Sequence, residues 1–399
     1  MPIQVGVVGK PNTGKSTLFA AATLTDVKRA PYPFTTIDPN IGIGYVRVKC
    51  VCKEIGVKDN PRNSICIDGW RFIPVELIDV AGLVPEAWKG RGLGNRFLDH
   101  LRRASVLIHV IDASGGTDEE GRPVKPGTYD PAHDIEFLER ELDMWMFQII
   151  SKDWEKISKI MDINKNYEEL FKRFSGLEIS REKVLEAIER LGLFSKRVIN
   201  WTQDDILSLI REVRRKAKPI VIAANKADID IAEDNIKRLQ KEFGKRYKII
   251  PTSAESELAL RRAAKAGLIK YLPGDSDFEV IGQLTKKQED ALEYIRNNVL
   301  QRYGSTGVQQ VINTAVLDEL GMIAVFPVEN DTKFTDHKGN VLPDVYLVPK
   351  DTTAKEFAYK IHTDLGEKFA FAIDALTKKR ISAEEKLYHR MVIKIITSR

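Results

Sequence analysis

The chain has 399 residues, of which 43% are hydrophobic and 30% are charged, with a formal net charge of +5 at pH 7. This length suits two or three domains, and the composition is that of a globular protein. No apolar run approaches the ~20 residues of a membrane-spanning helix, and the first residues read as a strand rather than a signal peptide. We therefore expect a cytoplasmic protein with no membrane partner, whose mild basic bias permits RNA without requiring it.

The first predicted strand, Val5–Val8, leads into a glycine-containing loop, residues 9–17, and a predicted helix that starts near Leu18. The loop has the pattern G-x-x-x-x-G-K-[ST] in the strand–loop–helix context that this motif requires. We expect the nucleotide to contact Gly9, Pro11, Asn12, Thr13, Gly14, Lys15, Ser16 and Thr17. The alternative, an ordinary glycine-containing turn, does not explain the full pattern.

The residue types in this loop suit phosphate chemistry. Gly9 and Gly14 let the backbone turn so that N–H groups point at phosphate oxygens, and the helix N-terminus adds its positive dipole end. Lys15 supplies a cation for the β- and γ-phosphates, and the Ser16 hydroxyl can bind Mg²⁺.

The next segment, residues 30–40, is rich in proline and should be an extended loop. A threonine on such a loop can place its hydroxyl on Mg²⁺ and its N–H on the γ-phosphate, and it is released when that phosphate leaves. We assign this role to Thr36, with Thr35 as the alternative.

Strands are predicted over 41–48 and 72–78, and the second ends at Asp79, three residues before Gly82. A carboxylate at the end of a buried strand is costly unless it is paired, and beside a phosphate loop it can hold Mg²⁺ through water. The Gly82 N–H can sense the γ-phosphate. Glycines at 90, 92 and 94 then make a hinge-rich loop.

The three cysteines are Cys50, Cys52 and Cys66. They do not make a disulfide framework. Cys50 and Cys52 have a spacing that can bind a metal, but the set lacks a fourth thiolate or a nearby histidine. We expect reduced cysteines that are buried or lie on an edge strand.

Continuous apolar runs at 106–111 and 219–224 predict central parallel strands. The second run ends in Asn225-Lys226-Ala227-Asp228. Asp228 can accept hydrogen bonds from N1–H and N2–H₂ of guanine, a donor pair that adenine lacks, so it would discriminate strongly. Asn225 can fix the loop and face the purine, Lys226 can lie over the ring, and the backbone of Ser253 and Ala254 can contact O6.

Together these motifs resemble the GTPases of the translation-factor class, and within them the Obg family. The most specific matches are Tyr32–Thr36 with Pro39–Gly42, and Gly90–Leu98 after Asp79–Leu83. The layout is similar to the YchF branch, whose members resemble ATPases because their base-reading motif lacks the aspartate. This chain has Asp228, so the resemblance implies GTP and GDP as ligands, with Mg²⁺.

Leu83 stands where Ras-like enzymes have a glutamine that orients the attacking water. Leucine cannot hydrogen-bond water, so water must be positioned in another way. Families with this substitution often use K⁺ held by the loop asparagine, here Asn12, because a cation beside the phosphates stabilises the developing charge. The alternative is that Asn12 is a turn residue. On this resemblance the catalytic set is Lys15, Thr36, Gly82 and Asn12, and the metal ligands are Ser16, Thr36 and, through water, Asp79.

The segment between the strand ending at Asp112 and the one starting at Pro219 is far longer than a simple crossover needs. Apolar residues at helical spacing run from 135 to 149 and continue one position out of phase from 150 to 161. Helices are predicted over 181–191 and 203–216, the latter capped by Thr202 with Asp205. In the family such insertions resemble effector arms, and the alternative is passive packing against the nucleotide domain.

The C-terminal part begins with predicted helices over 255–271 and 285–302. From Met322 the pattern reads β-β-α-β-β, with its helix over 353–365, and residues 345–375 closely resemble a TGS domain, a ubiquitin-like β-grasp module associated with RNA. The basic residues of this part are a tentative RNA contact, or equally a solvated charge run; they are Lys378, Lys379 and Arg380, with Lys386, Arg390 and Lys394.

The predicted fold class is therefore α/β, a P-loop GTPase domain with a mostly parallel sheet, a helical insertion and a C-terminal TGS domain. We predict a split GTPase domain over 1–127 and 219–275, the insertion over 128–218, a helical connection over 276–320 and the TGS domain over 321–399. The expected function is a slow GTPase switch acting on the ribosome, rRNA or tRNA, with no DNA partner and with an unidentified activating protein or exchange factor. The alternatives are an RNA-binding adaptor with negligible turnover and an ATPase.

Overall fold

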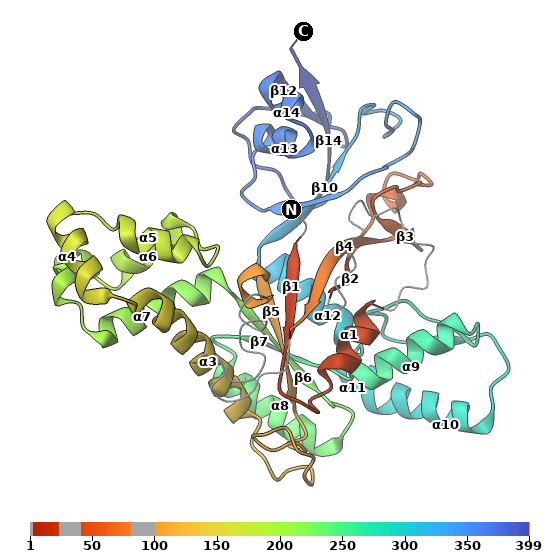
Figure 1. Cartoon of the computed structure of the whole chain (residues 1–399). Helices are drawn as coiled ribbons and strands as arrows, with labels where there is room; N and C mark the ends of the chain where they lie inside the picture. The colour runs from red at the N-terminus through yellow and green to blue at the C-terminus, as the bar shows by residue number, and fades with distance from the viewer. Residues whose placement is uncertain (1–2, 24–40, 81–99, 399) are drawn as a thin grey trace. The chain divides into compact units, whose positions relative to one another are not determined.

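The computed structural model describes residues 3–23, 41–80 and 100–398 (Figure 1). Packing divides the chain into two units. One contains residues 1–21 and 77–311, and the other contains residues 22–76 and 312–399. These units are defined by packing, and they group residues 22–76 with the C-terminal part, whereas we predicted residues 1–127 to belong to the GTPase domain. The predicted domain boundaries therefore stay predictions.

The first unit is built on parallel strands. They are β1 (Gln4–Val8), β5 (Val106–Asp112), β6 (Ile220–Asn225) and β7 (Lys248–Pro251). All residues of β5 and β6 are buried, as expected for central strands covered on both faces. Three further strands join the larger sheet, β2 (Ile41–Lys49), β3 (Ile65–Ile67) and β4 (Trp70–Asp79). The strand order is β2-β4-β1-β5-β6-β7, with β3 paired to β4. The last three residues of β4 lie in the first unit and the others in the second. The predicted mostly parallel α/β fold is confirmed.

Helices α1 (Lys15–Thr23), α8 (Asp230–Phe243) and α9 (Ala254–Lys265) follow β1, β6 and β7. The predicted helix over 255–271 is too long. Gly267 has φ +71°, a left-handed conformation that ends the helix without strain. Ile269–Lys270 then forms β8, which pairs with β9 (Glu279–Val280).

The segment between β5 and β6 is helical, as predicted. It contains α3 (Ala132–Ser151), α4 (Trp154–Asn164), α5 (Glu168–Ser175), α6 (Arg181–Arg190) and α7 (Gln203–Ala217), with 3₁₀ turns η3 (Leu193–Ser195) and η4 (Val198–Asn200). Asp153 has φ 51° and separates α3 from α4, whereas the predicted change of phase at residue 150 lies within α3. Thr202 and Asp205 form the predicted capping box of α7. Figure 1 shows α3 leading into the cluster of α4–α7.

Another helical stretch follows β9. It consists of α10 (Lys286–Ile295), the π-helical turn η5 (Arg296–Leu300), α11 (Gln301–Tyr303), α12 (Val308–Asn313) and the π-helical turn η6 (Thr314–Glu319). The predicted break between helices is present, because Gly304 and Gly307 have φ values of +77° and +81°. This stretch supplies contacts to the candidate site described below.

The second unit contains a five-stranded sheet of order β11-β10-β14-β12-β13. Its strands are β10 (Met322–Pro327), β11 (Tyr346–Pro349), β12 (Phe369–Asp374), β13 (Arg380–Ile381) and β14 (Met391–Thr397). β10 runs parallel to β14 and antiparallel to β11, consistent with the predicted β-grasp module. The predicted helix over 353–365 is two helices, α13 (Ala354–Ile361) and α14 (Thr363–Glu367), because His362 has an extended backbone.

The second unit also contains the earlier segment with β2 (Ile41–Lys49), the 3₁₀ turn η1 (Val51–Lys53) and β3 (Ile65–Ile67). β3 pairs antiparallel with the start of β4. Among the helices that the structure describes, none is both long and apolar enough to cross a membrane.

Candidate nucleotide-binding site

The loop between β1 and α1 depends on two glycines. A Cβ on Gly9 would lie 2.6 Å from the carbonyl oxygen of Val110, so β5 approaches too closely for a side chain. Gly14 has φ +90°, and a Cβ there would collide with the amide of Asn225. Its carbonyl accepts the first hydrogen bond of α1, from the Leu18 N–H at 2.9 Å. Glycine is thus required here both by conformation and by packing.

Two further contacts fix the loop, one within the loop and one with a segment distant in the sequence. The Thr13 hydroxyl donates to the carbonyl of Lys10 at 3.0 Å. The Asn12 amide donates to the carbonyl of Gly121 at 2.8 Å, and Asn12 has φ 64°. Asparagine tolerates this left-handed conformation better than most residues. Asn12 therefore has the conformation of a turn residue in addition to any role toward a cation.

Lys10 was not predicted to matter, yet it is a main anchor of the loop. Its Nζ donates to Asp134 at 2.8 Å and to the carbonyl of Thr117 at 3.1 Å, and it lies 3.8 Å from the ring centre of Tyr129. Burial raises the pKa of Asp134 to about 6, although the Lys10 charge opposes this rise. Through Asp134, on α3, the phosphate loop is tied to the helical insertion.

Lys15 and Asp79 are brought together at the open side of the loop, where they form an ion pair. Asp79 ends β4, and the next N–H, of Val80, donates to the carbonyl of Val7 at 3.0 Å. Ser16 is exposed in the first turn of α1. A hydroxyl and a carboxylate are oxygen donors of the kind that Mg²⁺ prefers, so these residues fit the predicted metal.

Asn225 links the phosphate loop to the predicted base-reading segments. Its Nδ2 donates to the carbonyl of Thr13 at 2.8 Å, and its Oδ1 accepts from the Ala254 N–H at 3.0 Å. The side chain is almost fully buried. These two hydrogen bonds connect the phosphate loop to the start of α9, and the predicted role of Asn225 toward the nucleotide stays a prediction.

Lys226 has φ 61°, and its Nζ forms an ion pair with Asp112 at 2.7 Å. Asp112 is buried and also accepts hydrogen bonds from the hydroxyls of Ser114 and Thr117 at 2.6 and 3.2 Å. Asp112 was not predicted to be a site residue. Its place at the end of a predicted central strand could have indicated one, because Asp112 ends β5 directly beside Asn225, which ends β6.

Asp228 is oriented by its neighbours. The Ser253 hydroxyl contacts Asp228 Oδ1 and Ser256 Oγ, both at 2.8 Å. The Tyr294 hydroxyl donates to the Asp228 carbonyl at 3.0 Å, and the Tyr303 hydroxyl donates to that of Ala227 at 3.1 Å. Residues beyond the predicted GTPase domain thus hold the loop that carries Asp228.

The backbone N–H groups of Ser253 and Ala254, which we expect to contact guanine O6, already donate hydrogen bonds within the protein. The Ser253 N–H already donates to the carbonyl of Thr306 at 2.9 Å, and the Ala254 N–H donates to Asn225 Oδ1. To contact guanine O6, one of these N–H groups would have to donate to the base as well as to its present acceptor. The contact of the Ser253 hydroxyl with Asp228 was not predicted from the sequence, in which only the Ser253 backbone was expected to contribute.

Several predicted residues lie outside the described residues. They are Thr36 with its alternative Thr35, Gly82, Leu83 and the glycine-rich loop at 90–94. Their roles stay predictions.

The tentative RNA contact lies in the second unit, where its cations have local partners. Lys379 pairs with Glu385 at 2.7 Å and Lys386 with Asp351 at 2.7 Å. Lys378 and Lys394 pair with Asp331, and Arg390 pairs with Glu54. The Arg380 guanidinium lies 4.0 Å from the ring centre of Phe371.

Models of three protein families match the chain. Residues 4–165 match a 50S ribosome-binding GTPase family, and residues 334–397 match the TGS domain. Residues 223–330 match the Obg-like GTPase YGR210-like, G4 motif-containing domain.

A GTP-binding protein of Methanocaldococcus jannaschii is 51% identical over 397 residues, covering 99% of each chain. The ribosome-binding ATPase YchF of Bacillus subtilis is 32% identical over 270 residues, covering 65% of this chain and 68% of its own.

Solved structures give a consistent result. A GTP-binding protein from Pyrococcus horikoshii is 42% identical, with a TM-score of 0.80 over 99% of this chain and 100% of that one. The Schizosaccharomyces pombe YchF GTPase shares the fold at 20% identity, with a TM-score of 0.58 over 99% of this chain and 98% of that one. The glycine loop, the Asp228 segment and these full-length similarities place the chain in the YchF-like branch of the Obg family of GTP-binding proteins, with a C-terminal TGS domain.

Proposed function

We propose that this protein binds GTP and hydrolyses it to GDP and phosphate as a conformational switch. The observation that carries this proposal is the position of Asn225, whose side chain bonds both the phosphate loop and the segment beside Asp228. One buried amide thereby couples the part of the site suited to phosphates to the part suited to guanine.

The proposed roles follow from the chemistry of each group. Lys15 stabilises negative charge on the β- and γ-phosphates, which requires it to exchange its ion pair with Asp79 for phosphate. Ser16, Thr36 and, through water, Asp79 would hold Mg²⁺, which when bound would supply positive charge beside the phosphates. Gly82 and Thr36 sense the γ-phosphate and release their loops after hydrolysis.

Guanine selection can be tested by exchanging one group. Asp228→Asn should weaken GTP binding and favour xanthosine triphosphate, because an amide can donate to the oxygen that xanthine carries in place of the guanine amino group. The control is Asp230→Asn, an exposed carboxylate two residues away. Equal binding of ATP and GTP by the unmodified protein would instead favour an ATPase, the activity named for the B. subtilis relative.

Turnover and its dependence on K⁺ separate a GTPase from an adaptor. We expect faster hydrolysis in K⁺ than in Na⁺ if the Asn12 oxygen binds the cation. Asn12→Ala should lose this difference, whereas Asn12→Asp keeps an oxygen but loses the donor to Gly121. Loss of the K⁺ effect in both variants would indicate that Asn12 acts by holding the turn through its bond to Gly121. Negligible hydrolysis by the unmodified protein in either salt would favour the adaptor.

We further propose that the ribosome, or an RNA within it, is the partner. The matching GTPase family and the B. subtilis relative both carry ribosome binding in their names. Co-sedimentation with ribosomes should be stronger with a non-hydrolysable GTP analogue than with GDP, or the reverse. Equal co-sedimentation in both states would contradict a nucleotide-controlled ribosome switch. If an activating protein or an exchange factor exists, adding cell extract to the purified protein should accelerate GTP hydrolysis or GDP release.

A further inference from the structure

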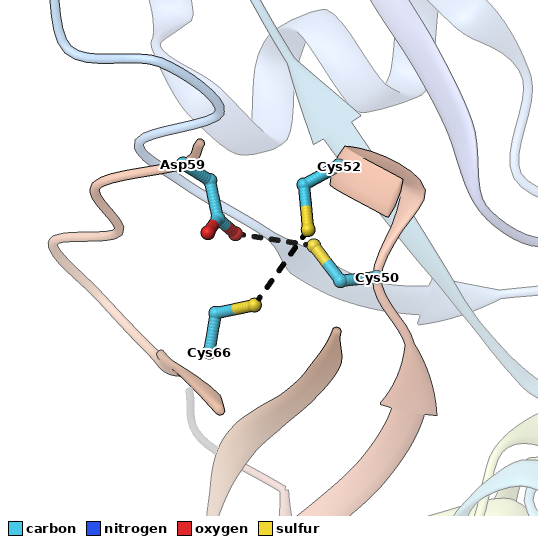
Figure 2. Close-up of side chains that lie close together, drawn as sticks. All are labelled: Cys50, Cys52, Asp59 and Cys66. Atoms are coloured by element: carbon cyan, nitrogen blue, oxygen red, sulfur yellow. Dashed lines mark hydrogen bonds between the residues drawn. The ribbon is translucent and has the colours of Figure 1, made fainter. Parts of the chain in front are cut away.

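The three cysteines converge on one carboxylate in the second unit. Figure 2 shows Cys50, Cys52, Cys66 and Asp59 with their sulfur and oxygen atoms directed at a common point. All of these ligand atoms lie within 4.8 Å of one another. The sequence has no fourth cysteine and no histidine near these three, and in the structure Asp59 takes the fourth position.

Two distances between these atoms are close to those of a tetrahedral metal site, and the others are no longer than 4.8 Å. Zn–S bonds of about 2.3 Å at tetrahedral angles place two sulfurs roughly 3.8 Å apart, and a sulfur and a carboxylate oxygen roughly 3.5 Å apart. The Cys52 and Cys66 sulfurs are 3.8 Å apart, and the Cys50 sulfur is 3.2 Å from Asp59 Oδ2. The atoms would need only small shifts to bind an ion.

The backbone that carries these side chains comes from separate elements. Cys50 directly follows β2, Cys52 lies in η1, and Cys66 is the middle residue of β3. The Cys50 N–H donates to the carbonyl of Gly69 at 2.8 Å, which closes the end of β2 onto the β3–β4 turn. Cys50 and Cys52 are buried.

Arg71 supplies the outer contacts that metal ligands usually have. Its side chain is fully buried, and its Nη2 lies 2.7 Å from Asp59 Oδ2 and 3.5 Å from the Cys50 sulfur. Its Nη1 donates to Ser64 Oγ at 3.0 Å. Arg71 pairs with Cys66 in the register of β3 and β4. A fully buried cation beside these groups offsets the negative charge of a carboxylate and thiolates around one divalent ion.

We propose that Cys50, Cys52, Cys66 and Asp59 bind one Zn²⁺ in a closed, structural site. Thiolate-rich tetrahedral sets favour Zn²⁺ over Mg²⁺, and four protein ligands leave no open position for catalysis. Binding replaces the thiol protons, which pass to solvent, and involves no redox step.

The site would fix a loop that holds the second unit together. Between Cys52 and Cys66, the Asn60 N–H donates to the carbonyl of Val341 at 3.0 Å and the Arg62 N–H to that of Pro343 at 2.7 Å. The Asn63 amide donates to the carbonyl of Val345 at 2.9 Å. Residues 341–345 lead into β11, so metal at the base of the loop would stabilise its contacts with the TGS domain.

The test uses the full-length protein with bound GDP and Mg²⁺ under reducing conditions. After loading with Zn²⁺ and desalting, elemental analysis should find one zinc per chain. Protein loaded with Co²⁺ should show the absorption of tetrahedral cobalt together with thiolate-to-cobalt charge transfer. This spectrum reports tetrahedral thiolate ligation without any substitution. Wild-type protein that keeps no metal although its thiols are reduced would overturn the proposal, and so would a cobalt spectrum without charge transfer.

Variants then assign the ligands. Cys66→Ser should lose the equivalent of zinc and the charge-transfer band, and Asp59→Asn should bind the metal more weakly. Asp351→Asn changes an exposed carboxylate of the same unit and should keep the full equivalent. Zinc that remains at one equivalent in Cys66→Ser would overturn the proposal by placing the ion elsewhere. If Cys66→Ser does not fold, the cobalt spectrum of the wild-type protein still decides.

Discussion

Two lysine–carboxylate pairs, one in each unit, have almost the same length and very different surroundings. Lys10 and Asp134 are 2.8 Å apart, with side chains that are each 5% exposed. Lys379 and Glu385 are 2.7 Å apart, with side chains that are 65% and 34% exposed. The two pairs therefore differ in burial and not in the distance between their charged atoms. Charges removed from water depend on their partner, whereas exposed charges are already solvated.

The largest effect should come from breaking the buried pair. Lys10→Met leaves Asp134 as a buried carboxylate without its cation, and we expect a loss of about 3–5 kcal/mol in the free energy of unfolding. Denaturant unfolding measures it. The double variant Lys10→Met/Asp134→Leu removes both charges and should recover most of the loss. A double variant as unstable as the single one would show that packing, rather than charge, dominates at this position.

The same pair gives a pH dependence. The folded-state pKa of Asp134 is raised from 3.8 to about 6, chiefly by burial. The folded chain therefore holds a proton that the unfolded chain releases between these values, and this contribution to stability is lost as pH rises through about 6. In Lys10→Met the pKa should rise further, so the variant should be closest to wild type in stability at acid pH. A constant difference across pH 4–7, measured by denaturant unfolding, would contradict this.

His109 sharpens the comparison, because it is a buried titratable group with a cation nearby. Burial, assisted by the Lys10 charge, lowers its pKa from 6.5 to about 3. Between these values the unfolded chain binds the extra proton, so the His109 contribution to stability should fall as pH drops, by up to about 1.4 kcal/mol per pH unit, and it is opposite in sign to the Asp134 contribution. His109→Leu should flatten this slope in unfolding measured from pH 7 to pH 4.

The contrast between these pairs also explains what the sequence could predict. The phosphate loop and the Asp228 segment are short motifs whose chemistry lies within a few neighbouring residues. Lys10 and Asp134 are separated by 124 positions and have no motif, so only the fold brings them together. Asp59 was missed for the same reason, because a single aspartate in a loop has no spacing that marks it as a partner of the cysteines.

Errors in the predicted elements have local causes. The pattern of apolar residues over 255–271 is helical, but Gly267 ends the helix and the apolar Ile269 belongs to a strand instead. Similarly, His362 divides the predicted helix over 353–365 by adopting an extended backbone. Periodicity identifies which residues face the core, and single backbone conformations decide where an element ends.

The smallest effects on stability should come from the exposed pair, where they can test the tentative RNA contact. Lys379→Ala and Glu385→Gln each break the Lys379–Glu385 pair, and each should change the free energy of unfolding by no more than about 1 kcal/mol.

The effects of these two substitutions on RNA affinity should be opposite. If Lys379 binds phosphate, Lys379→Ala weakens RNA binding and reduces its salt dependence, whereas Glu385→Gln strengthens binding by freeing the lysine from a competing carboxylate. The measurement is an RNA titration at two salt concentrations. Unchanged affinity in both variants would indicate that these basic residues are solvated charges that do not contact RNA. The two substitutions remove the same ion pair with little change in stability, so opposite effects on RNA affinity cannot arise from altered folding.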